Sequence, residues 1–285
     1  MMNKDFAVFI LTHGRPNNVI TLNTLKKAGY NGNLYIIIDN EDKTSSEYYD
    51  NFGDKVIMFD KKEISKTFDE ADNFEDRRAI VYARNACFNI AKDLGIKYFI
   101  QLDDDYDRFD YSFKKDLEYN TAHKPIKNIN KVFNLLLEFY KKTDIKSIAM
   151  GQGGDFIGGS NSGLWKKQLK RKAMNSFICS VERPFQFLGR INEDVNTYTY
   201  EGSKGSLFFT TALLRLNQKE TQSNSGGMTD IYLDKGTYFK SFYSVMIMPS
   251  SVTITTMGIR NRRLHHRINW KNTIPVILDE KYKKK

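Results

Sequence analysis

Three consecutive aspartates, Asp103, Asp104 and Asp105, follow the short apolar run Tyr-Phe-Ile-Gln-Leu. The run has the length and composition of a buried strand, so the carboxylates stand at a strand end. Side chains alternate along an extended segment, which places Asp103 and Asp105 on one side and Asp104 on the other. Converging carboxylates are ligands for Mg2+ or Mn2+, which substrate phosphates commonly share. The spacing predicts a metal and diphosphate site; the alternative is a solvated acidic turn.

Apolar runs with polar ends recur in the N-terminal part of the chain. Phe6 to Leu11 and Asn33 to Asp39 are typical of strands covered on both faces, and Lys55 to Phe59 predicts a third strand. A helix capped by Asn17 or Asn18 is expected between the first two. This order of elements predicts a parallel α/β sheet, in which ligands bind at the carboxyl ends of the strands.

The remaining elements follow from periodicity and from glycine content. We expect helices over 76–94 and 126–140, strands over 147–150, 176–181 and 206–214, and a short helix that begins within 192–195. A glycine-rich stretch starts at Gly151, and the segment 218–227 is almost entirely polar. Both are predicted to be loops, and loops of such length are usually functional or mobile.

The composition is that of a soluble globular protein. The 285 residues can bury a sizeable core, and 40% of them are hydrophobic. No apolar stretch approaches the length of a membrane span, and the N-terminus lacks a signal-peptide core, so we expect no membrane association and a cytoplasmic location. Cys87 and Cys179 lie in apolar segments and are predicted to be buried thiols.

The net charge of +10 favours a polyanionic partner, because neutralising phosphates releases counterions and supplies affinity. A generally basic surface is the alternative interpretation. Two groups of basic residues are candidates for contacts with DNA. They are Lys166, Lys167, Lys170, Arg171 and Lys172 after the glycine-rich stretch, and Arg260, Arg262 and Arg263 near the C-terminus.

The predicted strand ends also carry candidate contacts for a sugar nucleotide. Thr12 and Arg15 follow the first strand and could contact the nucleoside or a phosphate. Asp39 follows the second strand and could accept a hydrogen bond from ribose or base. Arg84, on the helix before the aspartates, could face the diphosphate; an ion pair on the helix surface is the alternative. Asp104 either contacts ribose or faces solvent.

The order of these motifs resembles the GT-A-fold glycosyltransferases. The motifs are Thr-His-Gly-Arg-Pro after the first strand, the Asp39 strand end, Ala-Arg-Asn at 83–85, the aspartate triplet and Asn-Glu-Asp-Val at 192–195. The resemblance spans roughly residues 6–267. It implies an α/β fold: a Rossmann-like mixed, mainly parallel sheet flanked by helices, with a C-terminal extension on the acceptor side.

The resemblance also implies a metal and a donor. In that family an Asp-x-Asp motif binds Mn2+ or Mg2+ together with the diphosphate of a nucleotide sugar, and we favour a UDP-sugar. Asp103 and Asp105 occupy the two motif positions in this chain. A C-terminal histidine often ligates the metal, which would be His265 or His266; a nucleic-acid contact or an exposed pair is the alternative.

A downstream Glu-Asp pair can contain the catalytic base in that family, and it corresponds to Glu193 and Asp194. We expect Asp194, in preference to Glu193, to accept the proton of the acceptor hydroxyl, which would then attack the anomeric carbon and invert its configuration. The alternative role of Asp194 is to cap a helix.

More narrowly, the chain is similar to phage glycosyltransferases found beside TET-like oxygenases, which are proposed to glycosylate 5-hydroxymethylpyrimidines in DNA. This similarity implies a DNA acceptor, such as 5-hydroxymethylcytosine, and the cytoplasm of an infected host. We expect one domain over 1–270, with a nucleotide-sugar half over 1–105 and an acceptor half over 106–270, and a basic tail over 271–285. A non-DNA acceptor, a non-catalytic nucleic-acid-binding protein and a metal-dependent nuclease are the alternatives.

Overall fold

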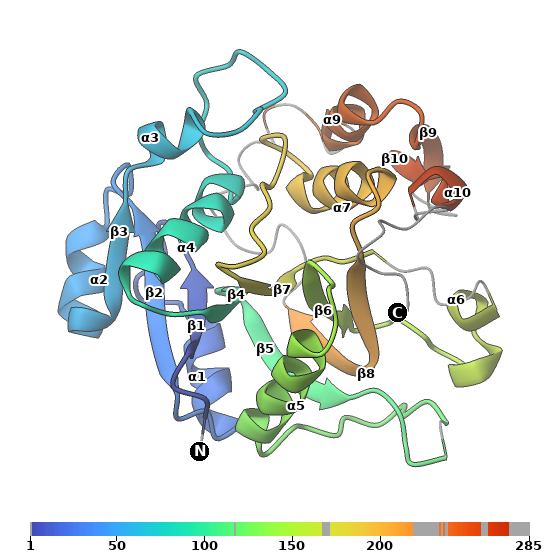
Figure 1. Ribbon diagram of the computed structural model, residues 1–285, viewed down its shortest axis with the longest axis horizontal. Helices are drawn as coiled ribbons and strands as arrows, with labels where there is room; N and C mark the ends of the chain where they lie inside the picture. The colour runs from blue at the N-terminus through green and yellow to red at the C-terminus, as the bar shows by residue number, and fades with distance from the viewer. Residues whose placement is uncertain are drawn as a thin grey trace.

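The protein is built on a central sheet flanked by helices (Figure 1). A computed structural model describes residues 2–116, 118–166, 172–218, 234, 236, 239–257 and 262–273. The strands of the sheet are β1 (Phe6–Leu11), β2 (Asn33–Asp39), β3 (Val56–Phe59), β4 (Tyr98–Asp103), β5 (Tyr106–Tyr111), β6 (Ser147–Gln152), β7 (Ser176–Ser180) and β8 (Phe208–Gln218). Their order across the sheet is β3-β2-β1-β4-β7-β6-β8-β5.

The direction of the strands confirms the predicted fold class. Strands β1 to β4, β6 and β8 run one way, whereas β7 is antiparallel to β4 and β6, and β5 is antiparallel to β8. The sheet is therefore mixed and mainly parallel, as the resemblance implied. The carboxyl ends of β1, β2 and β4 lie at one edge, because these strands are parallel neighbours.

Two helical layers bury the two faces of the sheet. The helices are α1 (Ile20–Lys27), α2 (Ser45–Phe52), α3 (Lys61–Ser65), α4 (Val81–Asp93), α5 (Ile129–Lys141), α6 (Gly163–Lys166), α7 (Glu193–Ser203), α9 (Phe239–Ile247) and α10 (Trp270–Thr273), with short 3-10 turns at Gly53–Lys55 and Gly159–Asn161. Side chains of α1, α2 and α5 pack on one face, and those of α3, α4 and α7 pack on the other.

Strand β1 shows why the apolar runs predicted the strands so well. Phe6, Val8 and Ile10 enter the core shared with α1 and α5, whereas the alternate residues Ala7 and Phe9 enter the core shared with α4. Both faces of a parallel strand are buried, so its sequence is continuously apolar rather than alternating.

Some element boundaries differ from the sequence expectations. Helix α1 is preceded by Val19 at the N-cap and has no side-chain cap, so neither Asn17 nor Asn18 caps it. Helix α4 begins only at Val81, after a loop. Strand β5 was not predicted, because its charged residues lack the apolar run that marked the other strands; it pairs with β8 instead of with a sequence neighbour.

The C-terminal residues add a layer beside α7. Figure 1 shows α9, α10 and the antiparallel hairpin of β9 (Val252–Met257) and β10 (Arg263–Ile268) gathered at this helix. The rings of Tyr198 on α7 and Trp270 are stacked, with centroids 6.0 Å apart. The domain limits at 270 and 271 stay a prediction, and residues 274–285 of the expected tail lie outside the described ranges.

Two further expectations concern the thiols and the membrane. Cys87 and Cys179 are both free and buried, as predicted. Within the described ranges, no helix combines the length and the apolar character needed to cross a membrane.

Candidate active site

Arg84 joins the aspartate triplet to the start of α7. Its Nε donates to Oε1 of Glu193 (2.9 Å), and its Nη2 donates to Oδ1 of Asp103 (3.0 Å). The guanidinium carbon lies 5.2 Å from the ring centroid of Phe177 and 5.8 Å from that of Phe187. Only 3% of Arg84 is exposed, so the alternative of a surface ion pair is wrong.

The charge of Arg84 is sustained by its two carboxylate partners. Burial disfavours the guanidinium, but the charges of Asp103 and Glu193 outweigh it and raise the pKa of Arg84. One nitrogen, Nη1, is buried and has no hydrogen-bond partner among the described residues. A buried donor without a partner is unfavourable, so this side chain fits an anionic ligand such as a phosphate.

Asp104 ties the end of β4 to the loop after β1. Its Oδ2 accepts from Oγ1 of Thr12 (2.7 Å), and its Oδ1 accepts from Nη1 of Arg15 (3.0 Å). The residue is 4% exposed, so it does not face solvent. The interaction with Arg15 and Thr12 places the first and fourth strand ends against each other, at the edge where the sequence predicted a ligand.

Asp103 and Asp105 are the more accessible carboxylates of the triplet. Burial and then the charges of Asp103 and Asp104 raise the pKa of Asp105 to about 7, although Arg15 acts in the opposite direction. Burial also raises the pKa of Asp103, against the effect of Arg84. Such crowding of carboxylates is relieved when a divalent cation binds. The two side chains therefore fit the metal expected from the sequence.

The raised pKa values predict how stability depends on pH. Asp105 and Glu193 both have a pKa of about 7 in the folded protein, because of burial and neighbouring carboxylates. At Asp105 and Glu193 the folded state binds more protons than the unfolded chain between about pH 4 and that value, so the contribution of these two groups to the free energy of unfolding falls as pH rises. His265 and His266, whose pKa values are lowered, contribute in the opposite direction, so thermal melts in chelator must compare a variant of Asp105 with the unaltered protein, and Mn2+ should reduce the difference.

Relative to the unaltered protein, Asp105→Asn should lose the fall in the free energy of unfolding that Asp105 contributes as pH rises, because the variant has no proton to release at this position. The exposed neighbour Asp107 provides a control, and Asp107→Asn should melt as the unaltered protein does at each pH. Identical pH profiles for Asp105→Asn and the unaltered protein would contradict the assignment of the titration to Asp105.

Asp39, at the end of β2, is already engaged within the protein. Nδ1 of His13 lies 2.8 Å from its Oδ2, and the buried Nζ of Lys61 lies 2.9 Å from its Oδ1. Burial opposes ionisation, but the hydrogen bond from His13 and the charge of Lys61 more than offset it and lower the pKa of Asp39. The contact of Asp39 with ribose or base stays a prediction. In the structure its two carboxylate oxygens are bound by His13 and Lys61.

Tyr48 is a site residue that the sequence did not reveal. Its hydroxyl lies 2.8 Å from Oγ1 of Thr12 and accepts from the backbone N–H of Arg15 at 2.8 Å. Helix α2 delivers it from a segment with no motif, so only the packing of this helix on the sheet identifies it. Lys61 and Asp42, whose Oδ2 accepts from the backbone of Gly14 (2.6 Å), were not predicted as site residues either, and His13 was given no role although it lies in the Thr-His-Gly-Arg-Pro motif.

Helix α7 presents Glu193 and Asp194 in its first turn. The N-cap residue is Asn192, in the left-handed conformation at a φ of 62° and without a side-chain cap, so Asp194 is not the N-cap. Oδ1 of Asp194 accepts from the backbone N–H of Val195 (2.8 Å). Glu193 is buried against Arg84, whereas Asp194 is the more accessible of the pair.

The hairpin attaches to this same helix start through His266. Nδ1 of His266 lies 3.2 Å from Nδ2 of Asn192, and Nε2 contacts Nζ of Lys172. The ring of His265 lies against that of His266, with centroids 4.2 Å apart.

The surroundings of both histidines are cationic. Burial and then Lys172 lower the pKa of His266 to about 2; burial, Lys172, Lys240 and Arg263 lower the pKa of His265 to about 4. In the described part of the chain, no group of three or more His, Cys, Asp or Glu side chains could hold a metal ion. The structure does not bring the histidines to the aspartate pair, and their coordination of a metal stays a prediction.

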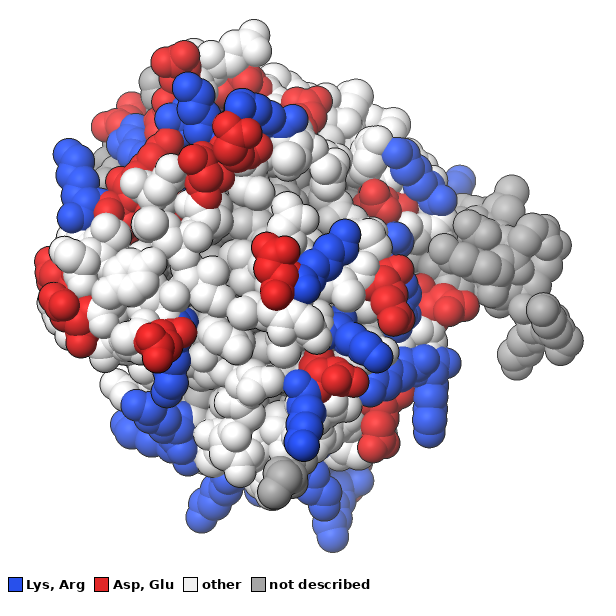
Figure 2. Space-filling model, turned by 60° about the vertical axis from the view of Figure 1, so that its left-hand side comes forward, with Lys and Arg blue, Asp and Glu red and all other residues white. Residues whose placement is uncertain are grey.

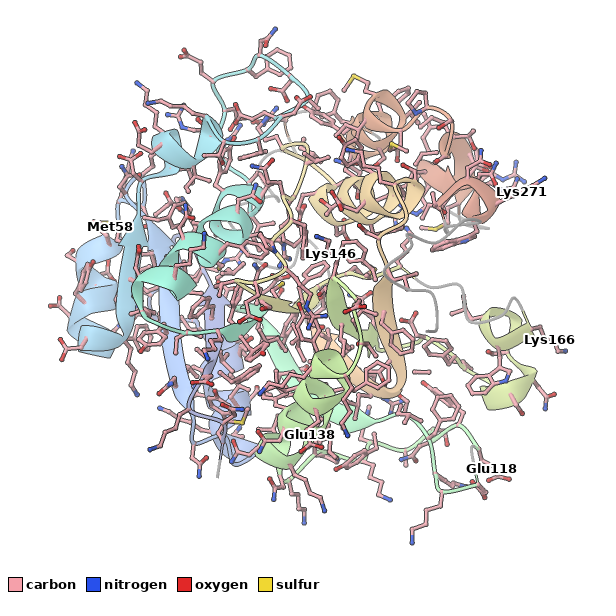
Figure 3. All side chains as sticks on the ribbon, in the orientation of Figure 1. Met58, Glu118, Glu138, Lys146, Lys166 and Lys271 are labelled. Carbon is pink, nitrogen blue, oxygen red and sulfur yellow. The ribbon has the colours of Figure 1, made fainter. Side chains whose placement is uncertain are left out.

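The residues expected to contact DNA are only partly described. Lys166 points outward from α6 (Figure 3), and Arg262 and Arg263 are exposed beside the hairpin. Lys167, Lys170, Arg171 and Arg260 lie outside the described residues. Acidic and basic side chains are interspersed on the face shown in Figure 2, so that face offers no continuous basic surface.

Comparison with known proteins gives one family. The profile of a family described as TET-Associated Glycosyltransferase (TAGT) matches residues 6–227. A search of the curated proteins gives no match.

Several solved structures resemble this chain at low identity. Glucosyl-3-phosphoglycerate synthase from Mycobacterium tuberculosis, in complex with Mn2+, UDP and phosphoglyceric acid, has 8% identity and a TM-score of 0.45, with 95% of this chain and 88% of that chain covered. The same synthase in complex with UDP has 11% identity and a TM-score of 0.41, with 93% and 90% covered. A further match is a mycobacterial protein at 9% identity and a TM-score of 0.43, with 92% and 83% covered.

Proposed function

The chain belongs to the TET-associated glycosyltransferase family, and from this we propose that it transfers a sugar from a UDP-sugar to the hydroxyl of a 5-hydroxymethylpyrimidine in DNA. The family match establishes a glycosyltransferase. The donor nucleotide, the metal, the acceptor and the roles of individual residues are the proposal.

One observation carries the proposed reaction centre. Arg84 contacts both Asp103 and Glu193, the neighbour of Asp194, and this supports a reaction centre in which the metal and diphosphate lie close to the base on α7. A transferase requires this proximity, because the leaving diphosphate and the attacking hydroxyl react at the same anomeric carbon.

The donor would lie at the carboxyl ends of β1, β2 and β4. Asp103 and Asp105 would hold Mn2+ or Mg2+, which when bound neutralises charge on the diphosphate. Nη1 of Arg84 would donate to a phosphate oxygen and so satisfy its missing partner. Thr12 and Arg15 would position the nucleoside or a phosphate, held in place by their contacts with Asp104.

Asp194 would act as the base. It takes the proton of the acceptor hydroxyl as the oxygen bonds to the anomeric carbon, while the bond from that carbon to the diphosphate breaks and its electron pair leaves with UDP. Attack opposite the leaving group inverts the anomeric configuration. Glu193 is less suited, because Arg84 and burial already engage it.

Mass spectrometry tests the substrates directly. The protein is incubated with a panel of nucleotide sugars and Mn2+, using hydroxymethylated duplex DNA and the same duplex without the hydroxymethyl group. We expect a mass increment of one sugar on the hydroxymethylated duplex alone, with the UDP-sugar. A small hydroxyl compound is included as a third acceptor, and sugar transfer to it but to neither duplex would overturn the proposal that DNA is the acceptor. Loss of all transfer in chelator would support the proposal that the reaction requires a metal.

A further inference from the structure

The hydroxyl of Tyr48 lies in a closed ring of hydrogen bonds between α2, the loop after β1 and the turn after β4. It lies 2.8 Å from Oγ1 of Thr12 and accepts from the backbone N–H of Arg15 at 2.8 Å. Oγ1 of Thr12 in turn donates to Oδ2 of Asp104 (2.7 Å), whose Oδ1 accepts from Nη1 of Arg15 (3.0 Å). One phenol thus connects the loop that carries Thr12 and Arg15 to the aspartate triplet.

The hydrogen-bond donors of this ring follow by elimination. A threonine hydroxyl carries one proton, and Thr12 gives it to the carboxylate of Asp104. The bond between Thr12 and Tyr48 therefore uses the proton of the tyrosine. Burial raises the pKa of Tyr48 to about 12, so the phenol keeps this proton at neutral pH. A phenylalanine at this position could neither donate to Thr12 nor accept from Arg15.

The core requires the ring of Tyr48 but not its hydroxyl. The side chain is fully buried in the core shared with α1 and α5, and its ring centroid lies 6.2 Å from that of Phe52. A phenylalanine would fill almost the same space, whereas a buried phenol needs hydrogen-bond partners. The partners of Tyr48 all belong to the proposed donor site. The polar atom of this side chain therefore serves the site rather than the core.

Residues 12–16 depend on neighbouring elements for their conformation. Gly14 has a φ of 68°, in the region that glycine adopts readily, so the free loop would have other conformations open to it. Oδ2 of Asp42 accepts from the backbone N–H of Gly14 (2.6 Å), and Nδ2 of Asn51 on α2 donates to the carbonyl of Pro16 (3.1 Å). Hydrogen bonds from outside the loop thus select one conformation.

We propose that Tyr48 is a positioning residue for the nucleotide donor: its hydroxyl holds residues 12–16 so that Thr12 and Arg15 are in place before the nucleotide binds. The inference rests on the proposed function, because that function assigns these two residues to the donor. Tyr48 touches no reacting atom, so it acts on donor binding and not on the transfer step. When the binding conformation of the loop is less populated, the apparent Kd rises by the same factor.

The test compares Tyr48→Phe with Tyr49→Phe, whose tyrosine lies on the same helix and is 43% exposed. Each substitution removes one phenol oxygen, but only the first removes it from the ring of hydrogen bonds. The Kd of UDP is measured by calorimetry with Mn2+, and KM and kcat are measured with the UDP-sugar and hydroxymethylated duplex DNA. Hydrogen exchange of residues 12–16 is followed by mass spectrometry without nucleotide and with saturating UDP. Urea denaturation shows that both variants are folded.

We expect Tyr48→Phe to raise the Kd of UDP and the KM for the UDP-sugar by about 3- to 10-fold, the factor that corresponds to one lost hydrogen bond, with kcat unchanged. Exchange of residues 12–16 should be faster in this variant without nucleotide, and UDP should restore its protection. Tyr49→Phe should match the unaltered protein in all measurements.

Two results would overturn the inference. An unchanged Kd in folded Tyr48→Phe would show that the hydroxyl contributes to stability alone. A raised Kd without faster exchange of residues 12–16 would show that the hydroxyl contacts the nucleotide itself and does not position the loop.

The outcome is separable from that of the proposed function, because UDP binding needs no acceptor. If the unaltered protein binds UDP but transfers no sugar to DNA, the proposed function fails, and the Kd and the exchange of residues 12–16 still decide the role of Tyr48. If sugar transfer to DNA occurs while Tyr48→Phe binds UDP as tightly as the unaltered protein, only the positioning role fails.

Discussion

Asp194→Asn should lower kcat for sugar transfer by about 10²- to 10⁴-fold, the usual contribution of a general base. Asparagine keeps the oxygen that accepts from the backbone of Val195, so the first turn of α7 should remain intact. It cannot take the proton of the acceptor hydroxyl. The KM for the donor should change little, because the proposed donor contacts lie on other elements. Single-turnover transfer measured by mass spectrometry, with donor binding by calorimetry, checks both expectations.

The control is a carboxylate outside the site. Glu138, labelled on α5 in Figure 3, is exposed, and Glu138→Gln should leave kcat unchanged. Glu193→Gln is informative as well, because this residue binds Arg84 and its main effect should be on stability. If Glu193→Gln abolished transfer in a fully folded protein while Asp194→Asn kept full kcat, the base would be Glu193.

Arg84→Met should reduce the free energy of unfolding by about 3–5 kcal/mol, the range for removing one partner of a buried ion pair. The variant leaves Glu193 buried and Asp103 partly buried without their shared cation. Methionine fills much of the volume that Arg84 occupies against the rings of Phe177 and Phe187, so loss of packing contributes less than loss of charge. Urea denaturation followed by circular dichroism measures the difference.

A surface pair supplies the comparison for that experiment. Arg77 pairs with Glu41 at 2.6 Å and is partly exposed, so Arg77→Met should cost less than about 1 kcal/mol. Adding Glu193→Gln to Arg84→Met should recover part of the lost stability, because it removes one of the two stranded charges. Equal effects for the two arginines would show that Arg84 does not anchor a buried network.

The pattern of apolar residues in the sequence predicted several strands of the central sheet. Strand β1 has the predicted bounds, Phe6–Leu11, and β2 has the predicted bounds, Asn33–Asp39, because continuous apolar runs have few other stable arrangements. Alternation of side chains is a property of extended segments, but Asp104 and Asp105 lie in the turn between β4 and β5, so alternation does not determine on which side each carboxylate lies. Strand β5 and the β9–β10 hairpin were not predicted, because pairing with distant partners, rather than hydrophobic pattern, stabilises them.

The long-range partners in the site could not be predicted in this way. Arg84 and Glu193 are 109 residues apart, and nothing in either segment encodes the other. Tyr48 likewise reaches Thr12 only because α2 packs on the sheet. Either His265 or His266 was expected to ligate the metal; the structure shows His266 in contact with Lys172 and Asn192, and the coordination of a metal stays a prediction.

The sequence by itself determined that carboxylates follow β4, that the chain is an α/β protein and that a Glu-Asp pair opens a later helix. These features follow from local properties of the sequence: the period of its apolar residues, the helix and strand propensities of its segments, and the polar residues at the predicted strand ends. The tertiary structure decided the surroundings of each carboxylate. It buried Glu193 against Arg84, left Asp194 accessible and placed cations around His265. Burial and charge at each carboxyl group depend on which distant segments surround it, and only packing brings those segments together.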